Sequence, residues 1–453
     1  MIFISIDENE VFNLRKLCDE IFGEECFVAQ ISLLCNPKGR SQDMYVATCH
    51  EYILCYSKSI LQKGAVSIEK SHEEIKNDYP FEDKNGRYRE LELRNTHREF
   101  GRHNRPNLYY PFYVGANGII SLKRTENDIE VYPIWDDGFN GCWTWGQDNA
   151  LQNIYLLSSK KVNGAWKIYR KAYAMQDGEI VRKQVKSIWT EKEYYTEKGQ
   201  STFNALFNTK EKIFQSPKSV DLIRVLIKMS QAKERDTILD FFSGSATTAH
   251  AVMQVNAEGS DKLKFIMVQI PEQTDKSSEA YKAGYKNFCE IGKERIRRAG
   301  EKIKGGKPLF TTDLDIGFKV FKLDSSNLKI WDNSPTMNEA EVAKRIQESI
   351  LYLLSDRNDI DILYEIMLKF GLFLTIPVEE FSVNGTTVYI ISAYAYKVIV
   401  CIQPITLESV EQILHDFPEV GTFIFADKCF ANANELINTQ EILKKTDRKM
   451  KLF

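Results

Sequence analysis

The residues best suited to binding a ligand lie in Thr237–Val252, where an apolar run meets small side chains. The apolar run up to Phe242 is typical of a buried strand, and the residues after the small side chains suit a helix packed on a sheet. Between them, Ser243, Gly244 and Ser245 let the backbone turn sharply and approach a ligand. Because free backbone N–H groups at a helix N-terminus attract anions, the segment predicts an anion- or nucleoside-binding turn. A turn with a purely structural role is the alternative.

A second apolar run lies shortly downstream and is followed by a carboxylate. Lys264–Ile270 is typical of a buried strand, and Pro271 and Glu272 end it. In α/β nucleotide-binding folds, an acidic residue at a strand tip after a glycine turn binds the ribose hydroxyls. The two strands together therefore predict a nucleoside site in which Glu272 binds the ribose.

Arginine and asparagine residues precede an aromatic cluster in Leu93–Tyr113. These side chains pair with guanine and adenine edges, and arginine also binds phosphates. The candidate DNA-binding residues are Arg94, Asn95, Arg98, Arg102, Arg105 and Asn107. A solvated loop that Tyr109, Tyr110 and Phe112 anchor to the core is the alternative.

Length and composition exclude several classes of protein. A chain of 453 residues has room for about two to four domains. The formal net charge of −3 argues against a histone-like binder but allows local DNA contacts. The cysteines form no CxxC pair, and the group Cys49, His50 and Cys55 lacks a second ligand pair, so no zinc site is predicted. Neither a signal peptide nor an apolar run of membrane-spanning length is present, so a cytoplasmic protein is expected.

Other apolar patterns predict the elements that hold these residues in place. Near the N-terminus, Met1–Asp7 and His50–Lys58 are typical of strands, and Glu8–Phe22 is typical of a helix between them. The apolar face expected for that helix consists of Val11, Leu14, Leu17, Cys18 and Ile21. Phe214–Met229 predicts a further helix, with Pro217 in its first turn.

The last third of the chain predicts a separate α/β region. Helices are expected over Ala340–Leu354 and Asp359–Phe370, and strands over Ile316–Leu323, Thr387–Ala393, Val398–Ile402 and Thr422–Phe425. Asp427 and Asn432 lie near a strand end, where we assign them to a turn and a cap.

These stretches resemble the S-adenosylmethionine-binding half of amino-DNA methyltransferases of the beta order, in particular the modification (Mod) subunits of type III restriction-modification systems. In that family the cofactor motifs follow the target-recognition region, as they would here. The resemblance runs from the first residue to the last, and is carried by Phe214–Lys218, Asp240–Gly244, Glu272, Lys293–Lys304, Arg105–Pro111 and Gly141–Asp148. Ala246 stands where the family has the second glycine of its Phe-x-Gly-x-Gly loop. Alanine is the smallest replacement, so the turn is expected to form.

The resemblance implies a cofactor, a substrate and partners. The cofactor is S-adenosylmethionine, and the methyl group goes to adenine N6 of a base flipped out of double-stranded DNA. The implied cofactor-binding residues are Pro217, Lys218, Asp240, Phe242, Ser243, Gly244, Ser245, Thr247, Thr248 and Glu272. The family works as a homodimer with a restriction (Res) subunit.

The catalytic motif of the family, Asp-Pro-Pro-Tyr or a close variant, is missing, because no two prolines are adjacent. The nearest fragment, Asn36–Gly39, lacks the second proline and the aromatic residue and is assigned to a loop. No catalytic residue is therefore identified. We expect a chain truncated before the motif and inactive by itself, with a separate polypeptide segment as one source of the missing motif.

The expected fold is α/β, with a Rossmann-like methyltransferase core, a parallel-rich sheet, an inserted recognition domain and a small C-terminal domain. The expected domains are residues 1–59 (part of the catalytic half), 60–210 (target recognition), 211–305 (the S-adenosylmethionine-binding half) and 306–453 (the α/β domain). The expected function is that of an adenine-N6 DNA methyltransferase subunit. Two alternatives are a non-catalytic DNA-binding or assembly subunit and a nicotinamide- or other nucleotide-dependent enzyme. The loop is not Gly-x-Gly-x-x-Gly, which argues against the last.

Overall fold

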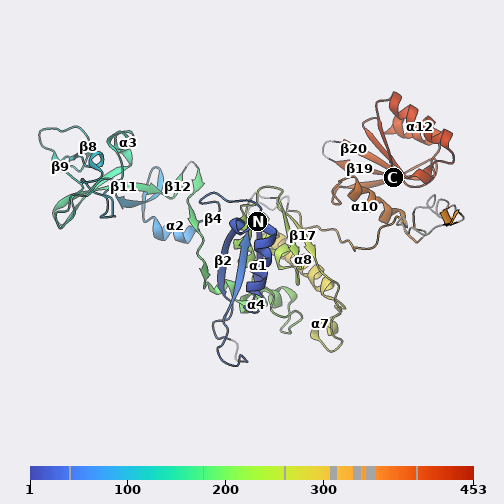
Figure 1. The fold of residues 1–453 in the computed structure, drawn as a ribbon, viewed down its shortest axis with the longest axis horizontal. Coiled ribbons are helices and arrows are strands. Elements are labelled where there is room, and N and C mark those ends of the chain that lie inside the picture. The colour runs from blue at the N-terminus through green and yellow to red at the C-terminus, as the bar shows by residue number, and fades with distance from the viewer. Residues whose placement is uncertain are drawn as a thin grey trace. The chain divides into compact units, whose positions relative to one another are not determined.

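The structure is a computed structural model, and it describes residues 1–453 except 40–41, 177, 260–261, 307–313, 330–337, 340, 343–352, 355 and 394–395. The chain divides into two compact units, Met1–Gly317 and Phe318–Phe453. Figure 1 shows the helices and strands of each unit. Within the described residues, no helix combines the length and the apolar character needed to span a membrane.

The first sheet of the N-terminal unit has the strand order β1-β3-β2-β15. Its strands are β1 (Ile2–Ile6), β2 (Phe27–Leu34), β3 (His50–Tyr56) and β15 (Ile188–Trp189). Both β1 and β2 pair antiparallel with β3, so they run in the same direction and their carboxyl ends lie at the same edge. Helices α1 (Val11–Phe22) and α5 (Val220–Ser230) pack on this sheet.

Alternating side chains of β3 explain why both faces of the sheet are covered. Leu54 and Tyr56 belong to the cluster under α1, whereas Ile53 and Cys55 belong to the cluster under α5. Successive side chains of a strand point to opposite faces, so this apolar run requires a helix on each side. The Tyr56 hydroxyl also donates to Asp19 Oδ1 of α1 at 2.6 Å, which fastens that helix to the strand.

A second, separate sheet consists of two parallel strands, β16 (Thr237–Phe241) and β17 (Lys264–Val268). Helix α6 (Thr247–Glu258) covers one face, where Ile238 and Phe265 pack against its buried residues. Helix α8 (Phe288–Gly305) lies against α6. The opposite face is apolar and exposed, and we call it the open apolar face. It consists of Leu239, Phe241, Ile266 and Val268, whose exposed fractions are 54%, 58%, 53% and 43%.

Two small sheets share a core in the part of the chain between β3 and β15. One sheet has the order β10-β11-β6-β5, with β5 (Phe81–Asp83), β6 (Gly86–Glu92), β10 (Leu157–Val162) and β11 (Ala165–Tyr173). The other has the order β8-β7-β9, with β7 (Phe112–Val114), β8 (Ile120–Ser121) and β9 (Ile129–Val131). Their common core contains Leu93, Trp143 and Ile168. The indole N–H of Trp143 donates to the Tyr110 carbonyl at 2.7 Å.

Shorter elements complete this unit. The helices are α2 (His72–Asp78), α3 (Gln147–Gln152), α4 (Thr196–Phe207) and α7 (Glu279–Lys282). The strand pairs are β4 (Ser67–Glu69) with β14 (Arg182–Gln184), and β12 (Met175–Gln176) with β13 (Glu179–Ile180).

The C-terminal unit is a five-stranded mixed sheet in the order β18-β19-β20-β21-β22. Its strands are β18 (Val378–Val383), β19 (Thr386–Ala393), β20 (Tyr396–Cys401), β21 (Thr422–Phe425) and β22 (Lys449–Leu452). Its helices are α10 (Asp359–Lys369), α11 (Leu407–Asp416) and α12 (Ala433–Lys445). Residues of α10 belong to one apolar cluster, and residues of α11 and α12 to another.

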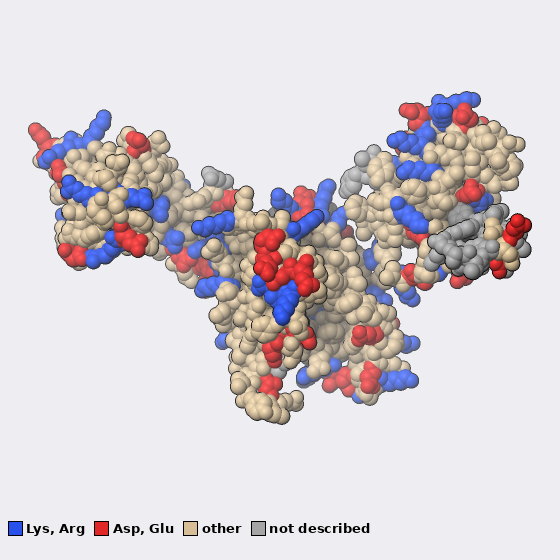
Figure 2. Space-filling model, in the orientation of Figure 1, with Lys and Arg blue, Asp and Glu red and all other residues tan. Residues whose placement is uncertain are grey.

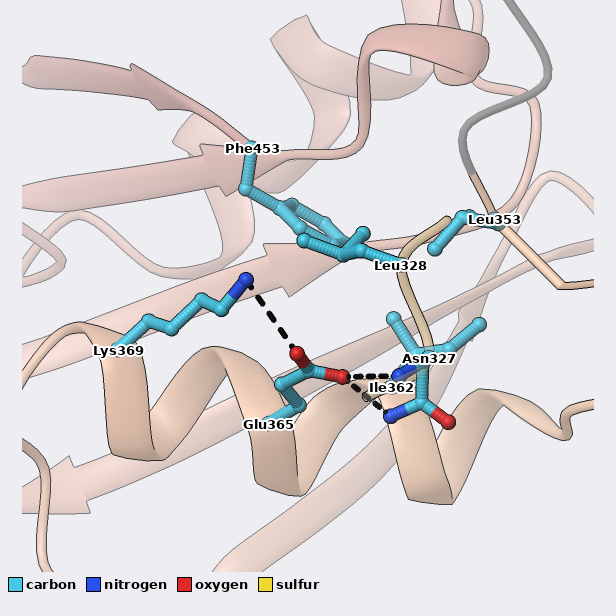
Figure 3. A pocket seen from close by; sticks show the side chains of 7 residues that line it. All are labelled: Asn327, Leu328, Leu353, Ile362, Glu365, Lys369 and Phe453. Carbon is cyan, nitrogen blue, oxygen red and sulfur yellow. Dashed lines mark hydrogen bonds and ion pairs between the residues drawn. The ribbon is translucent and has the colours of Figure 1, made fainter. Parts of the chain in front are cut away.

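A polar contact fastens the start of this unit to α10 (Figure 3). Glu365 accepts hydrogen bonds from both the backbone and the side-chain nitrogen of Asn327 at 2.7 Å, and Lys369 lies 3.3 Å from the same carboxylate. The space among these side chains does not admit a water molecule. The group is therefore a packing contact rather than a ligand site.

Several sequence predictions are confirmed within a few residues. The strands β1, β3, β16, β17, β19, β20 and β21 and the helices α1, α5, α6 and α10 lie where apolar patterns predicted them. The helix predicted over Ala340–Leu354 falls almost entirely outside the described residues.

Other predictions are wrong in detail. The chain forms no strand over Ile316–Leu323. Pro217 precedes α5 instead of lying in its first turn, because the helix begins at Val220. Leu17 and Ile21 of α1 are 51% and 64% exposed, so the apolar face that packs on the sheet is narrower than predicted. The mixed α/β class is confirmed, but the core strands form two sheets, and the first of them contains more antiparallel than parallel pairs.

Candidate functional site

The loop between β16 and α6 contains the turn at which the sequence predicted a ligand. Gly244 has φ +52°, in the left-handed region that favours glycine. Its N–H donates to Gln269 Oε1 at 2.7 Å, and the N–H of Ser243 donates to the Val268 carbonyl at 2.9 Å. Both acceptors lie at the end of β17, so the loop is fastened to the neighbouring strand.

The start of α6 keeps the turn despite the missing second glycine. Ala246 has φ +59° and immediately precedes the helix, so the turn forms as predicted. An alanine in the left-handed backbone conformation costs about 1–2 kcal/mol of conformational energy, which a glycine at this position would avoid. Asp240 at the end of β16 accepts a hydrogen bond from Thr248 Oγ1 at 2.6 Å, which ties the strand end to the first helical turn.

A buried arginine supports the loop from behind. Arg295 of α8 is 0% exposed and donates to Ser245 Oγ at 2.6 Å and Thr247 Oγ1 at 2.7 Å. Burial lowers the pKa of its guanidinium to about 9. Its Nε and Nη2 are buried without a hydrogen-bond partner among the described residues. The sequence did not reveal this role, because Arg295 stands among the other basic residues of Lys293–Lys304 and nothing in the local pattern distinguishes it from them.

The segment Phe214–Lys218 passes beside the same loop. A Cβ atom on Gly244 would lie 3.3 Å from the Phe214 ring, so the two are in close contact. Pro217 is buried, and Lys218 forms an ion pair with Glu51 of β3. The predicted cofactor residues Pro217 and Lys218 therefore follow, by three and four residues, the phenylalanine that contacts Gly244, but the ammonium group of Lys218 already has a carboxylate partner.

A cavity of about 430 Å³ opens beside this ion pair. Its polar lining consists of Asn36, Glu51, Tyr195, Thr196, Glu197, Ser216 and Lys218. Asn36 follows the carboxyl end of β2, and ligands of open α/β sheets bind outside the carboxyl ends of the strands. Its side chain is partly engaged, since Nδ2 donates to the Gly39 carbonyl at 2.8 Å.

Glu272, the predicted ribose ligand, is exposed beyond the end of β17. Its backbone N–H donates to the Ile270 carbonyl at 2.8 Å, and its carbonyl accepts from the N–H of Phe288 at 3.1 Å. These bonds fix the backbone and leave the carboxylate at the surface. The side chain that bonds the loop is Gln269, which sequence reasoning missed although it directly follows the strand.

The six candidate DNA-binding residues divide into two groups. Arg94 is only 9% exposed, bonds both carboxylate oxygens of Glu92 at 2.8 and 3.2 Å, and lies 4.1 Å from the ring centre of Trp135. Asn95 is half-buried and accepts from the N–H of His97 at 2.9 Å. The side chains of Arg94 and Asn95 are therefore engaged by neighbouring residues of the protein and have a structural role.

The other four candidates are exposed on the loop that follows. They are Arg98, Arg102, Arg105 and Asn107. Arg102 lies 4.9 Å from the Tyr109 ring centre and Arg105 lies 5.0 Å from that of Phe100, so aromatic rings orient both guanidinium groups. Arg98 pairs with exposed Asp137. Figure 2 shows basic and acidic side chains interspersed over the visible face. A DNA contact on this face would therefore depend on small groups of basic residues, such as these exposed arginines.

The described residues contain no group of three or more His, Cys, Asp or Glu side chains that could hold a metal ion. Cys55, one of the three residues considered for zinc, is buried in the first sheet. Burial raises the pKa of its thiol to about 12, which disfavours the thiolate that a metal would need.

Comparisons with known proteins identify the family to which the chain belongs. A family model described as a DNA methylase matches residues 1–280. The type III restriction-modification enzyme EcoPI Mod subunit of Escherichia phage P1 is 31% identical over 409 residues, which is 88% of this chain and 60% of that protein. The type II methyltransferase M.KpnI of Klebsiella pneumoniae is 31% identical over 301 residues, 65% of this chain and 68% of that protein. The EcoP15I Mod subunit of Escherichia coli is 27% identical over 428 residues and is likewise covered over 60% of its length.

Proposed function

Because the chain belongs to the DNA methylase family, whose model matches residues 1–280, we propose that it is an adenine-N6 DNA methyltransferase subunit of a restriction-modification system. The observation that carries the proposal is the loop from Asp240 to Thr248, with its left-handed glycine and the helix that follows it. The two Mod relatives are named as subunits of type III restriction-modification enzymes, and the chain spans about 60% of their length.

The loop suits the methyl donor S-adenosylmethionine. Gly244 has no side chain to block a ligand, and hydrogen bonds with Gln269 and Arg295 hold the loop at Gly244, Ser245 and Thr247. Exposed Glu272 is available to accept hydrogen bonds from ribose hydroxyls. Lys218 would lie near the methionine carboxylate, with Glu51 keeping its ammonium group in place until the ligand arrives. When bound, the cofactor supplies the methyl group.

The cavity beside Lys218 suits a base flipped out of the duplex. Its volume of about 430 Å³ lies within the range of about 300–1,000 Å³ typical of ligand pockets. Glu51 and Glu197 offer acceptors for an exocyclic amine, and Tyr195 offers a ring for stacking. Ser216 lines the cavity two residues after Phe214, which touches the cofactor loop. Cofactor and base would therefore approach each other along this segment.

Double-stranded DNA would bind at the exposed arginine loop, Arg98 to Asn107. The arginines reach phosphates and base edges, and their aromatic neighbours restrict their rotamers before binding. A second copy of the chain and a restriction subunit are the protein partners we propose, since the Mod relatives are named as subunits of restriction-modification enzymes.

Isothermal titration with S-adenosylmethionine tests the proposal. Gly244→Asp places a carboxylate where the cofactor should lie and should abolish measurable binding. Gly421→Asp is a matched control, because no atom lies within 4 Å of its added Cβ and it belongs to the C-terminal unit. Equal affinity of the parent chain and the Gly244→Asp variant would place the cofactor elsewhere.

A second candidate is a non-catalytic DNA-binding or assembly subunit. The observation that favours it is the absence of adjacent prolines, and hence of an Asp-Pro-Pro-Tyr motif, from residues 1–453. Purified polypeptide of this sequence is then expected to transfer no radiolabelled methyl group to mixed-sequence DNA. Transfer that the Gly244→Asp variant loses would contradict this and would make Asn36 in the cavity the first residue to test as the ligand of the target amine.

A further inference from the structure

The loop between β2 and β3 presents an apolar tip to solvent. Its three consecutive residues Met44, Tyr45 and Val46 are 83%, 90% and 80% exposed. Figure 1 shows the loop as the blue segment that extends below the first sheet, and Figure 2 shows the end of this protrusion without charged side chains on the visible face. Contiguous exposed apolar side chains of this size mark an interaction site.

The base of this loop is held in place by specific contacts. Asp43 turns inward and accepts from the backbone N–H of Thr48 at 2.7 Å, and the Thr48 hydroxyl donates to Glu8 Oε1 at 3.3 Å. A Cβ atom on Gly39 would lie only 2.6 Å from that of Ala47, so the two sides of the loop approach closely there. The loop therefore exposes its apolar side chains, while its half-buried carboxylate is engaged by the loop's own backbone.

The base of the loop lies at the cavity described above. The loop begins at Cys35, Asn36 and Pro37, which line the cavity at the carboxyl edge of the first sheet. Exposed Lys38 follows them. A loop that carries an apolar tip and an exposed lysine matches duplex DNA, with stacked bases inside and phosphates outside.

We propose that Met44, Tyr45 and Val46 form a wedge that inserts between base pairs of duplex DNA beside the cavity. Apolar side chains inserted at a base step unstack it and kink the duplex. Extrusion of a base leaves a gap in the stack, and a wedge next to the receiving cavity fills that gap as the base leaves. Tyr45 stacks on the neighbouring base, and Lys38 contacts a flanking phosphate. This inference rests on the proposed DNA methyltransferase function.

Fluorescence anisotropy with a labelled mixed-sequence duplex tests the wedge in the full chain. The triple variant Met44→Ser, Tyr45→Ser, Val46→Ser should bind about tenfold to a hundredfold more weakly, because it cannot stack on the bases. The dependence of affinity on salt should not change, since every basic side chain that reaches a phosphate is retained. Leu368→Ser is the matched control, because Leu368 of α10 is 63% exposed and belongs to the C-terminal unit, and the affinity of this variant should equal that of the parent.

A conservative variant separates stacking from folding. Tyr45→Trp should keep the affinity of the parent, and its added indole emission should be quenched when DNA binds. Equal DNA affinity of the parent and the triple variant would overturn the wedge while leaving the proposed function intact. Loss of self-association by the triple variant, with unchanged DNA affinity, would assign the tip to a protein interface and also overturn it. Failure of the parent chain to bind DNA would overturn both proposals.

Discussion

At the scale of single residues, His250 is a buried histidine near Arg295, the arginine that hydrogen-bonds to the loop from Asp240 to Thr248. His250 in α6 is 3% exposed, and its Nδ1 has no hydrogen-bond partner among the described residues. Burial lowers the pKa of its imidazole to about 3, with a further contribution from the nearby charge of Arg295. Folding therefore favours the neutral form of this imidazole.

The first prediction concerns acid stability. Between pH 6.5 and about 3 the unfolded chain binds a proton at His250 and the folded chain does not, so the free energy of unfolding falls as the pH drops. From pH 7 to pH 5 this amounts to about 2 kcal/mol. His250→Gln removes the titrating group and should lose about that much less than the parent in urea unfolding at the two pH values. His72→Gln, at an exposed site in the same unit, should behave like the parent. An equal loss in the His250→Gln variant would show that this imidazole is protonated in the fold.

The sequence was sufficient to single out residues whose role follows from their immediate neighbours in the chain. Gly244, Thr247 and Thr248 stood out because a turn after a strand requires small residues and a helix start. It could not locate Gln269 or Arg295, since each acts through a partner that is distant in the sequence. Nor could it distinguish buried Arg94 from its exposed neighbours, because the Glu92 and Trp135 contacts appear only in three dimensions.

At the scale of elements, the strands β16 and β17 were predicted as fully buried, and the structure buries only one face of each. The apolar runs placed both strands correctly, but an apolar run does not say which element covers each face. Helix α6 covers the side with Ile238 and Phe265, and the open apolar face remains in contact with solvent in this structure. Such a surface, beside strand edges, favours association with another polypeptide segment or aggregation.

The open apolar face gives the second prediction. Leu239→Thr with Ile266→Thr should reduce the fluorescence of a bound hydrophobic dye and slow aggregation, while the free energy of unfolding changes by less than about 0.5 kcal/mol. The control pair Ile238→Thr with Phe265→Thr alters the face under α6 and should destabilise the fold by about 2 kcal/mol or more. Equal destabilisation by the two pairs would mean that the open apolar face is covered in solution.

At the scale of the whole molecule, the predicted resemblance to Mod subunits is confirmed by matches that extend over 88% of the chain. The domain boundaries and the individual binding residues stay predictions. Local patterns were sufficient to recognise the family, because its motifs are short and occur in a fixed order. The separation of the core strands into two sheets was not predictable, since strand pairing depends on contacts between distant segments.

The third prediction concerns how the molecule holds DNA. Arg98→Ala with Arg102→Ala should weaken duplex binding and lower the slope of log affinity against log salt by about one for each arginine that pairs with a phosphate. Arg297→Ala with Lys304→Ala removes two exposed basic residues of α8 and should leave both quantities unchanged. Gel-shift titrations over a range of salt concentrations measure the two quantities. If the variant with Arg98→Ala and Arg102→Ala has the same slope and affinity as the parent, this loop has a purely structural role.

The central claim is that one loop, Asp240 to Thr248, holds the methyl donor. Photolabelling the full chain with S-adenosylmethionine carrying a radioactive methyl group, followed by peptide mapping, locates that site directly. We predict saturable label in the peptides that contain Phe214–Lys218, Asp240–Thr248 or Gln269–Glu272, and none in the Gly244→Asp variant. Label confined to the C-terminal unit, or label in the loop peptides that the Gly244→Asp variant retains, would contradict this claim.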